Sequence, residues 1–294
     1  MIKYNDLNSY LQRRFGRKVY KIPINGGFTC PNRDGTLGTR GCIFCSGYGS
    51  GDFAPEADLT VSEQIEAGIA KVAAKMPENG GYIAYFQAFT NTYAPVERLR
   101  TLYTEAMEHP DIVAISIGTR PDCLAEDVLD LLEELNKIKP VWVELGLQTI
   151  HRKSAEYIRR GYELPVYDDA VRRLRERGIE TIVHVILGLP GETREDMLET
   201  VKYVADSGVQ GIKLQLLHVI EGTDIAEDYR AGKFECMSME EYIELVADCL
   251  KILPPDIVVH RMTGDGAKRT LVAPLWSADK KRVLNELKRR VEPL

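Results

Sequence analysis

Three cysteines lie close together near the start of the chain and could bind an inorganic group. Cys30, Cys42 and Cys45 are spaced C-x11-C-x2-C within a glycine-rich stretch, residues 26–45. Thiolates are soft ligands that select zinc, copper(I) or iron–sulfur clusters. Glycines let a backbone fold tightly around a compact object. The stretch therefore predicts a metal centre.

The number of thiols distinguishes two kinds of metal centre. A closed zinc site takes four nitrogen or sulfur ligands, and no histidine lies near these cysteines in the sequence. A four-iron cluster held by three cysteines would keep one iron open to another ligand, and an open iron implies chemistry. A zinc loop with a distant fourth ligand is the alternative. Cys123, Cys236 and Cys249 adjoin apolar helical patterns and are expected to be structural.

The cysteine stretch resembles the cluster-binding loop of radical S-adenosylmethionine (SAM) enzymes, although their commonest spacing is C-x3-C-x2-C. Four later motifs occur in an order that resembles the YhcC/YtqA-type (MnmL-like) family, relatives of the radical SAM domain of the Elongator catalytic subunit. The motifs are YFQAFTNTYA (85–94), GTRPD (118–122), VELGLQTI (143–150) and LGLPGET (187–193). The resemblance runs from about residue 15 to about residue 270, nearly the whole chain.

The resemblance implies two cofactors, a [4Fe–4S] cluster on Cys30, Cys42 and Cys45 and SAM on its open iron. Reductive cleavage of SAM would give methionine and a 5′-deoxyadenosyl radical. The cofactors carry the hard chemistry, and the protein binds and orients them. A reductase, a flavodoxin or a ferredoxin would supply the electron.

Polar residues after the expected strands are candidates for holding the amino-acid part of SAM. Thr90 and Asn91 follow the second strand, where similar enzymes bind the SAM amino group, although Thr-Asn is also a turn signal. Arg120 offers a bidentate fork to the SAM carboxylate, and Pro121 keeps it out of helical geometry. A surface arginine is the alternative.

Other candidates would serve the nucleoside part of SAM. Glu144 and Gln148 could bind ribose hydroxyls, because a buried carboxylate needs partners; a structural salt bridge is the competing interpretation. Gly188 and Gly191 match a stretch that approaches adenine in the resembled enzymes.

No catalytic residue is assigned beyond the cluster ligands. Candidates for the substrate pocket are His260, Arg261, Tyr85 and Gln87. The other histidines are expected in the core or on the surface, and aromatic residues near strands are mostly core.

Alternating strand and helix patterns must position these residues. They predict an α/β fold with a parallel, barrel-like sheet. Together with the family resemblance, this implies a parallel partial (β/α)6 barrel of radical SAM type with short N- and C-terminal extensions. We expect one domain, 1–294, with a core at about 18–220 and an extension at about 221–294. Strands are predicted at 18–24, 82–89, 112–117, 141–147, 180–187 and 211–217, with an extra one at 257–261; helices at 7–15, 60–76, 95–109, 122–137, 150–159, 165–177, 194–207, 238–253 and 277–291.

Composition limits the function classes. The chain has 294 residues, of which 44% are hydrophobic, and neither a signal peptide nor a membrane span is recognisable, so we expect a cytoplasmic protein without a membrane partner. Its net charge of −6 argues against nucleic-acid binding by bulk charge. Basic residues at 13–21 and 280–290 form either solvated faces or a phosphate grip made by the two chain ends.

The family resemblance implies a substrate, which the residues themselves do not show. Similar proteins mature the C5 side chain of tRNA wobble uridine from carboxymethylaminomethyl toward aminomethyl, so tRNA is the expected partner. One alternative is a radical SAM enzyme acting on a small metabolite or a peptide. Another is a non-catalytic, zinc-stabilised RNA-binding module.

Overall fold

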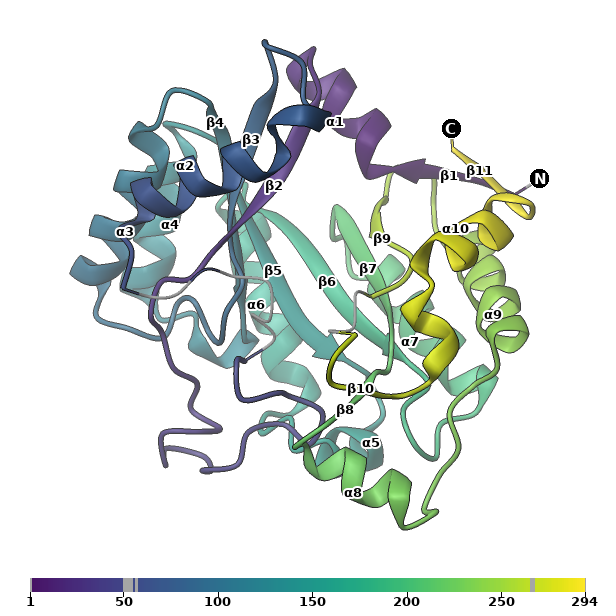
Figure 1. Cartoon of the computed structure of the whole chain (residues 1–294). Coiled ribbons are helices and arrows are strands. Elements are labelled where there is room, and N and C mark those ends of the chain that lie inside the picture. The colour runs from purple at the N-terminus through teal and green to yellow at the C-terminus, as the bar shows by residue number, and fades with distance from the viewer. Residues whose placement is uncertain (1, 50–54, 56–57, 265–267, 294) are drawn as a thin grey trace.

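The protein was analysed as a computed structural model that describes residues 2–49, 55, 58–264 and 268–293. In this part of the chain nine strands form one parallel sheet in the order β11-β1-β9-β7-β6-β5-β4-β3-β2 (Figure 1). The strands are β1 Ile2–Asp6, β2 Val19–Ile24, β3 Gly81–Phe86, β4 Ile112–Thr119, β5 Val141–Gln148, β6 Glu180–Leu187, β7 Gly211–Leu216, β9 Val258–Arg261 and β11 Val291–Pro293. Two short strands, β8 (Val219–Ile220) and β10 (Leu271–Ala273), pair antiparallel beside it.

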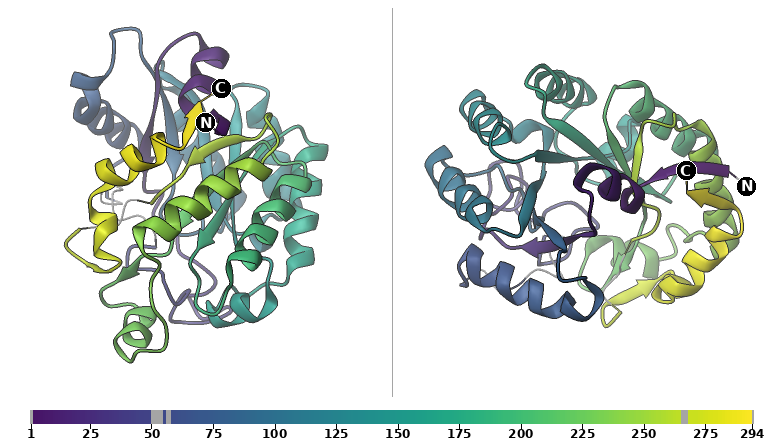
Figure 2. Two further views of the ribbon diagram at one scale, coloured as in Figure 1. Left: turned by 90° about the vertical axis from the view of Figure 1, so that its right-hand side faces the viewer. Right: turned by 90° about the horizontal axis from the view of Figure 1, so that it is seen from above.

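Most helices connect successive strands and lie on the outside of the sheet, whereas α1 lies across its amino end (Figure 2). Three of them, α2, α7 and α9, begin with capping boxes, in which a Ser or Thr and an acidic residue three positions later satisfy each other's backbone N–H groups. The helices are α1 Leu7–Phe15, α2 Val61–Val72, α3 Val96–Glu108, α4 Glu126–Asn136, α5 Arg152–Tyr157, α6 Leu164–Glu176, α7 Arg194–Asp206, α8 Asp224–Arg230, α9 Met239–Ile252 and α10 Lys280–Lys288.

The predicted fold class is confirmed, because β2 to β7 and their helices form the expected parallel α/β unit. The extra strand near 257–261 is present as β9. Sequence patterns gave no indication of five short elements: β1, β8, α8, β10 and β11. Two helices begin later than predicted. A 3₁₀ turn at Pro121–Cys123 precedes α4, and another at Leu275–Ala278 precedes α10, which starts after the Asp279 cap.

Side chains alternate between the two faces of the curved sheet. Outward residues such as Ile22, Phe86 and Val143 join the helices in the main hydrophobic core. Inward residues in the middle of the strands are polar, among them Glu144 and Lys213, which form an ion pair. A strand reverses its side-chain direction at every residue, so each strand contributes to both the core and the interior.

Helix α1 closes the amino end of the strands. Seen from above in Figure 2, it lies across the opening that the strands surround. Leu11 packs there with Val19, Ile83 and Trp142 in a separate hydrophobic cluster. The interior is therefore apolar at this end and polar further along the strands.

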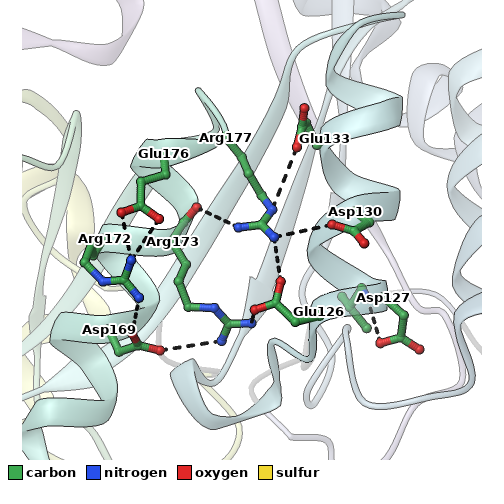
Figure 3. Close-up of polar contacts among 10 residues, drawn as sticks. Glu126, Asp127, Asp130, Glu133, Asp169, Arg172, Arg173, Glu176 and Arg177 are labelled. Atoms are coloured by element: carbon green, nitrogen blue, oxygen red, sulfur yellow. Dashed lines mark hydrogen bonds and ion pairs between the residues drawn. The ribbon is translucent and has the colours of Figure 1, made fainter.

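Exposed ion pairs connect α4 and α6 on the outside (Figure 3). Arg173 and Arg177 both bind Glu126, and Arg177 also reaches Asp130 and Glu133. Each acidic partner is well exposed, so a single pair contributes only about 1 kcal/mol or less. Among the described residues, no helix has the length and apolar character that crossing a membrane requires.

Candidate active site

A cavity of about 290 Å³ lies at the carboxyl ends of the strands, where parallel α/β barrels place their active sites. Residues from β3, β4, β5, β6 and β7 line it, and the loop after β2 forms one wall. Cys30, Cys42 and Cys45 all belong to this wall. The structure therefore brings the three predicted metal ligands to one cavity.

The cysteine loop is held by its own backbone and by one arginine. The Arg33 guanidinium donates hydrogen bonds to the carbonyl oxygens of Cys45, at 2.9 Å, and Ser46, at 2.6 Å. Gly41 has a positive φ of 74°, and a Cβ there would lie 2.9 Å from the Arg33 side chain. Glycine at position 41 thus allows the arginine to cross behind the loop.

The spacing of the thiols bears on what they could hold. Tetrahedral zinc with Zn–S bonds of about 2.3 Å would bring the sulfurs to about 3.8 Å from each other. Among the described residues, the three Sγ atoms do not form a group lying within 4.8 Å of one another. Burial raises the pKa of the Cys42 thiol to about 12, whereas metal coordination would deprotonate it. The spacing of the three thiols therefore suits a metal cluster better than a single metal ion.

Thr90 and Asn91 follow β3, but only Thr90 lines the cavity. Asn91 is fully buried behind it, and its side-chain amide donates to the Gly118 carbonyl oxygen at 2.8 Å. The Asn91 amide oxygen has no hydrogen-bond partner among the described residues. Asn91 therefore fixes the end of β3 against β4, and Thr90 is the residue exposed to a ligand.

Arg120 lies at the cavity wall and is 8% exposed. Asp122 accepts two hydrogen bonds from it, at 2.9 and 2.7 Å, and the guanidinium lies 5.4 Å from the centre of the Tyr162 ring. Desolvation lowers the pKa of Arg120, but the hydrogen bonds and charge of Asp122 outweigh this and raise it above its ordinary value. Arg120 is thus a rigid cation at the strand–helix junction.

The other predicted cofactor residues divide into two groups. Glu144 and Gln148 line the cavity, whereas Gly188 and Gly191 are not among its lining residues. Both glycines have positive φ, 91° and 83°, and shape the turn between β6 and α7. A Cβ on Gly188 would lie 2.9 Å from the Met237 methyl group.

Glu144 is the centre of a polar layer inside the sheet. Its carboxylate accepts hydrogen bonds from Lys21 at 2.5 Å, Ser116 at 2.6 Å and His184 at 2.7 Å, and it also binds Lys213. Burial alone would raise the pKa of Glu144, but the two lysines hold it well below its usual range. Glu144 is therefore an anion in the interior.

The two lysines and the histidine of this layer have lowered pKa values. Burial is the largest cause in each case, and neighbouring cations add to it for all three groups. The pKa of Lys213 falls to about 7 and that of His184 to about 4. Near neutral pH, Lys213 is consequently close to its midpoint and His184 is neutral.

Three of the four candidates for the substrate pocket line the cavity: Tyr85, Gln87 and Arg261. His260 does not. Its ring packs edge-on against Trp142 at 5.6 Å and lies over Gly211, where a Cβ would come within 2.8 Å of Nε2. Burial keeps the pKa of His260 well below its ordinary value. His260 thus belongs to the closed end of the interior.

Comparison with known proteins decides the family. The Radical SAM superfamily matches residues 33–204, more than half of the chain, and the Radical_SAM C-terminal domain matches residues 209–293. The chain belongs to the radical SAM superfamily. It is 47% identical to YtqA of Bacillus subtilis over 290 residues, which cover 99% of this chain and 90% of that protein.

Two further comparisons concern archaeal proteins. The chain is 29% identical over 164 residues to the tRNA uridine(34) acetyltransferase of Methanocaldococcus jannaschii, covering 55% of this chain and 30% of that protein. The structure of Methanocaldococcus infernus Elp3 matches with a TM-score of 0.67 at 19% identity, over 92% of this chain and 63% of that chain. The structural match shows a shared fold.

The protein is a radical SAM enzyme, with a [4Fe–4S] cluster and SAM as its cofactors. When bound, they supply one-electron cleavage of SAM. The residues present fit such a pair, because three thiols and a fixed guanidinium border one cavity. Lys21, Lys213 and His184 were not predicted to line or support this site. The sequence feature that could have identified them is a polar residue within an otherwise apolar strand, at a position whose side chain faces the interior.

Proposed function

We propose that this radical SAM enzyme modifies tRNA at the C5 side chain of the wobble uridine, carrying carboxymethylaminomethyl toward aminomethyl. The observation that carries the proposal is the similarity, over 55% of the chain, to an enzyme named for acting on tRNA uridine 34. Cys30, Cys42 and Cys45 hold the cluster. Thr90 and Arg120 bind the amino and carboxylate groups of SAM. A reductase, flavodoxin or ferredoxin is the electron donor.

The RNA-binding surface proposed here surrounds the cysteine loop. Arg40 and Arg152 line a second hollow of about 550 Å³, and their side chains are 73% and 76% exposed. Gly41, Arg160 and Tyr162 border both hollows. Exposed arginines beside a closed-ended cavity suit RNA in which one base is extruded and the neighbouring phosphates stay outside.

This location differs from the grip that the basic chain ends suggested. Helix α1 lies at the amino end of the strands, opposite the cysteine loop (Figure 1). Lys21, counted with that basic run, points into the interior and binds Glu144. Arg14 pairs with Glu180 and Arg290 with Glu244. Arg40 and Arg152 are likewise paired, with Asp224 and Glu156, so position and not pairing separates the two surfaces. These residues do not share a surface with the cavity.

The test is a reaction with defined RNA. The anaerobically reconstituted enzyme is incubated with SAM, a reductant and tRNA carrying 5-carboxymethylaminomethyluridine, and the nucleosides are analysed by mass spectrometry. We expect loss of that nucleoside, gain of 5-aminomethyluridine, and release of 5′-deoxyadenosine and of the carboxymethyl carbons as glyoxylate, all abolished by Cys42→Ala. In this balance SAM is the two-electron oxidant, and water hydrolyses the oxidised N–CH2 linkage. If the nucleoside is unchanged while SAM is cleaved, the substrate proposal is wrong. One zinc per chain with no SAM cleavage would contradict the cluster assignment.

A binding assay tests the RNA surface separately. Arg40→Glu with Arg152→Glu should weaken tRNA binding about tenfold or more and reduce its salt dependence, because phosphate contacts release counterions. Arg13→Glu with Arg290→Glu, which reverses two charges at the chain ends, is the matched control. Equal weakening by the control would locate the RNA elsewhere.

A further inference from the structure

Two cations on neighbouring strands face the inner end of the cavity. Lys213 on β7 pairs in register with Arg261 on β9, and both side chains line the cavity. Parallel strands lie about 4.8 Å apart, so the Lys213 ammonium and the Arg261 guanidinium project from the same face of the sheet, next to each other. Lys21 approaches the same region from β2, on the other side of the interior.

The acidic groups nearby do not balance these charges. Among the described residues that line the cavity, Glu144 is the single acidic side chain. Its carboxylate is already shared by Lys21, Lys213 and the His184 ring. Arg261 makes no ion pair or hydrogen bond with any other described residue, although it is half-buried.

An excess of positive charge in a partly buried space is unfavourable without an anion. Like charges at this separation repel, and removal from water strengthens the repulsion. The lowered pKa of Lys213, to about 7, has burial as its largest cause, with Lys21 and Arg261 contributing. A ligand anion between the guanidinium and the ammonium would relieve this repulsion and would gain charge-assisted hydrogen bonds.

The position of these cations separates them from the SAM-binding residues. Arg120, the candidate for the SAM carboxylate, lies at the carboxyl end of β4, and Asp122 neutralises it. Lys213 lies deeper, as the third residue of β7, in register with His184 in the middle of β6. A substrate group that reaches past the cofactor would meet Lys213 and Arg261.

We infer that Arg261 and Lys213 form an anion subsite that binds a carboxylate on the substrate, and that this carboxylate is the distal end of the modified side chain. The inference rests on the proposed function, because carboxymethylaminomethyl ends in a carboxylate. The guanidinium donates two hydrogen bonds to this carboxylate in bidentate geometry, and the carboxylate anchors the side chain at the inner end of the cavity. The subsite thus selects the carboxymethylated nucleoside over the aminomethyl product.

The test compares two free nucleosides, so that RNA binding plays no part. 5-Carboxymethylaminomethyluridine and its carboxamide analogue are titrated by calorimetry against the reconstituted enzyme with saturating SAM and no reductant. We expect the enzyme to prefer the carboxylate at least about tenfold. Arg261→Gln should reduce this preference to near unity, and Arg261→Lys should keep part of it.

Controls separate loss of the subsite from loss of the fold. Arg172→Gln, an exposed residue of α6 in the ion-pair network of Figure 3, should retain the full preference. Arg261→Gln must keep wild-type iron content and SAM affinity. Lys213→Met repeats the test from the neighbouring strand. Inorganic phosphate is titrated as a competitor, and it should displace the nucleoside less well than acetylglycine does.

The outcomes distinguish this inference from the proposed function. If the wild-type enzyme does not distinguish the carboxylate from the carboxamide, or if Arg261→Gln weakens SAM binding instead, the subsite is refuted. If phosphate competes better than acetylglycine, the carboxylate assignment is wrong. A carboxylate preference that depends on Arg261, without conversion of tRNA, would support the subsite and refute the tRNA proposal.

Discussion

Glu144 on β5 and Lys213 on β7 form an ion pair inside the sheet, although strand β6 lies between them. Their side chains are 0% and 5% exposed. The sheet curves strongly enough for alternate strands to meet across its interior. The Glu144 carboxylate is therefore the shared counter-charge and hydrogen-bond acceptor for the basic side chains of the polar layer.

Glu144→Gln should therefore destabilise the protein by about 3–5 kcal/mol, because it leaves Lys21 and Lys213 buried without a counter-charge. The measurement is the free energy of unfolding from anaerobic urea titrations. Glu134→Gln is the control, since it makes the same change in an exposed pair with Arg100 and should cost about 1 kcal/mol or less. Equal losses in the two variants would mean that the buried pair is not special.

Iron content should depend on three of the six cysteines. Alanine at Cys30, Cys42 or Cys45 removes a proposed ligand and should abolish most of the bound iron and the brown colour after reconstitution. Cys236→Ala should retain both. Cys123→Ala is the stricter control, because the charge of Cys30 contributes to the raised pKa of Cys123, so the two thiols lie near each other. Iron lost in Cys123→Ala would make it a fourth ligand.

Arg120→Lys should weaken SAM binding about tenfold, because a lysine cannot hold a carboxylate in bidentate geometry while also engaging Asp122. Equilibrium dialysis of the reconstituted enzyme measures this affinity. Arg100→Lys on α3 makes the same change in an exposed pair and should leave the affinity unaltered. An unchanged dissociation constant in Arg120→Lys would assign the SAM carboxylate to another cation.

Affinity for the carboxylate nucleoside should fall as the pH rises from about 7. Lys213 has a pKa of about 7 in the free enzyme, and a bound anion would raise it. Binding is therefore full below pH 7 and weakens between the free-state and bound-state pKa values. Calorimetry across pH 6–9 measures the trend, and the carboxamide analogue should show almost none. A flat profile for the carboxylate would exclude Lys213 as its partner.

Lys213 is the main source of the expected pH dependence of binding, because its titratable neighbours do not change charge in the same way near pH 7. Glu144, from β5, has a pKa held well below its usual range, so it stays charged. His184, from β6, has its pKa lowered to about 4 by burial and is neutral throughout. Burial raises the pKa of Tyr85, from β3. Lys21, from β2, has a lowered pKa too, so Lys21→Met serves to separate the two lysines. Arg261 is the neighbour from β9.

Leu11→Ala should cost about 2–5 kcal/mol, because Leu11 is 3% exposed and fills the closed amino end beneath α1. Leu275→Ala removes the same atoms from a side chain that is 72% exposed and should change stability by about 0.5 kcal/mol or less. Thermal unfolding of both variants under anaerobic conditions provides the comparison. A small loss in Leu11→Ala would mean that α1 is not tightly packed.

The β2–β7 unit could be predicted from the sequence because each strand and helix has a strong local pattern. Thr60 with Glu63 and Ser238 with Glu241, for example, mark helix starts that the structure contains. The elements β1 and β11 could not be predicted, because each is a short strand defined by pairing with the other end of the chain. Local patterns hold no information on such distant pairing.

The candidate site could be predicted in part. Its thiols follow one another in sequence and carry distinctive chemistry, so the cysteine loop was recognisable. Lys21 and Lys213 were not, since they are far apart in the chain and become neighbours of Glu144 only when the sheet curves. Lys21 also sits beside exposed basic residues, and its inward direction depends on strand register. Asn91 and Thr90 are adjacent, yet they face different surroundings.

Closure of the amino end by α1 has a kinetic consequence. Helix α1 and Leu11 fill that end, so the cofactor and the substrate reach the interior through the same mouth, next to the cysteine loop. Bound RNA, the larger of the two molecules, would cover that mouth and block the entry and exit of SAM and its products. For the proposed tRNA reaction, we therefore expect compulsory order: SAM binds before RNA, and the modified RNA dissociates before methionine and 5′-deoxyadenosine. Steady-state inhibition by 5′-deoxyadenosine would then be competitive with SAM and not with RNA.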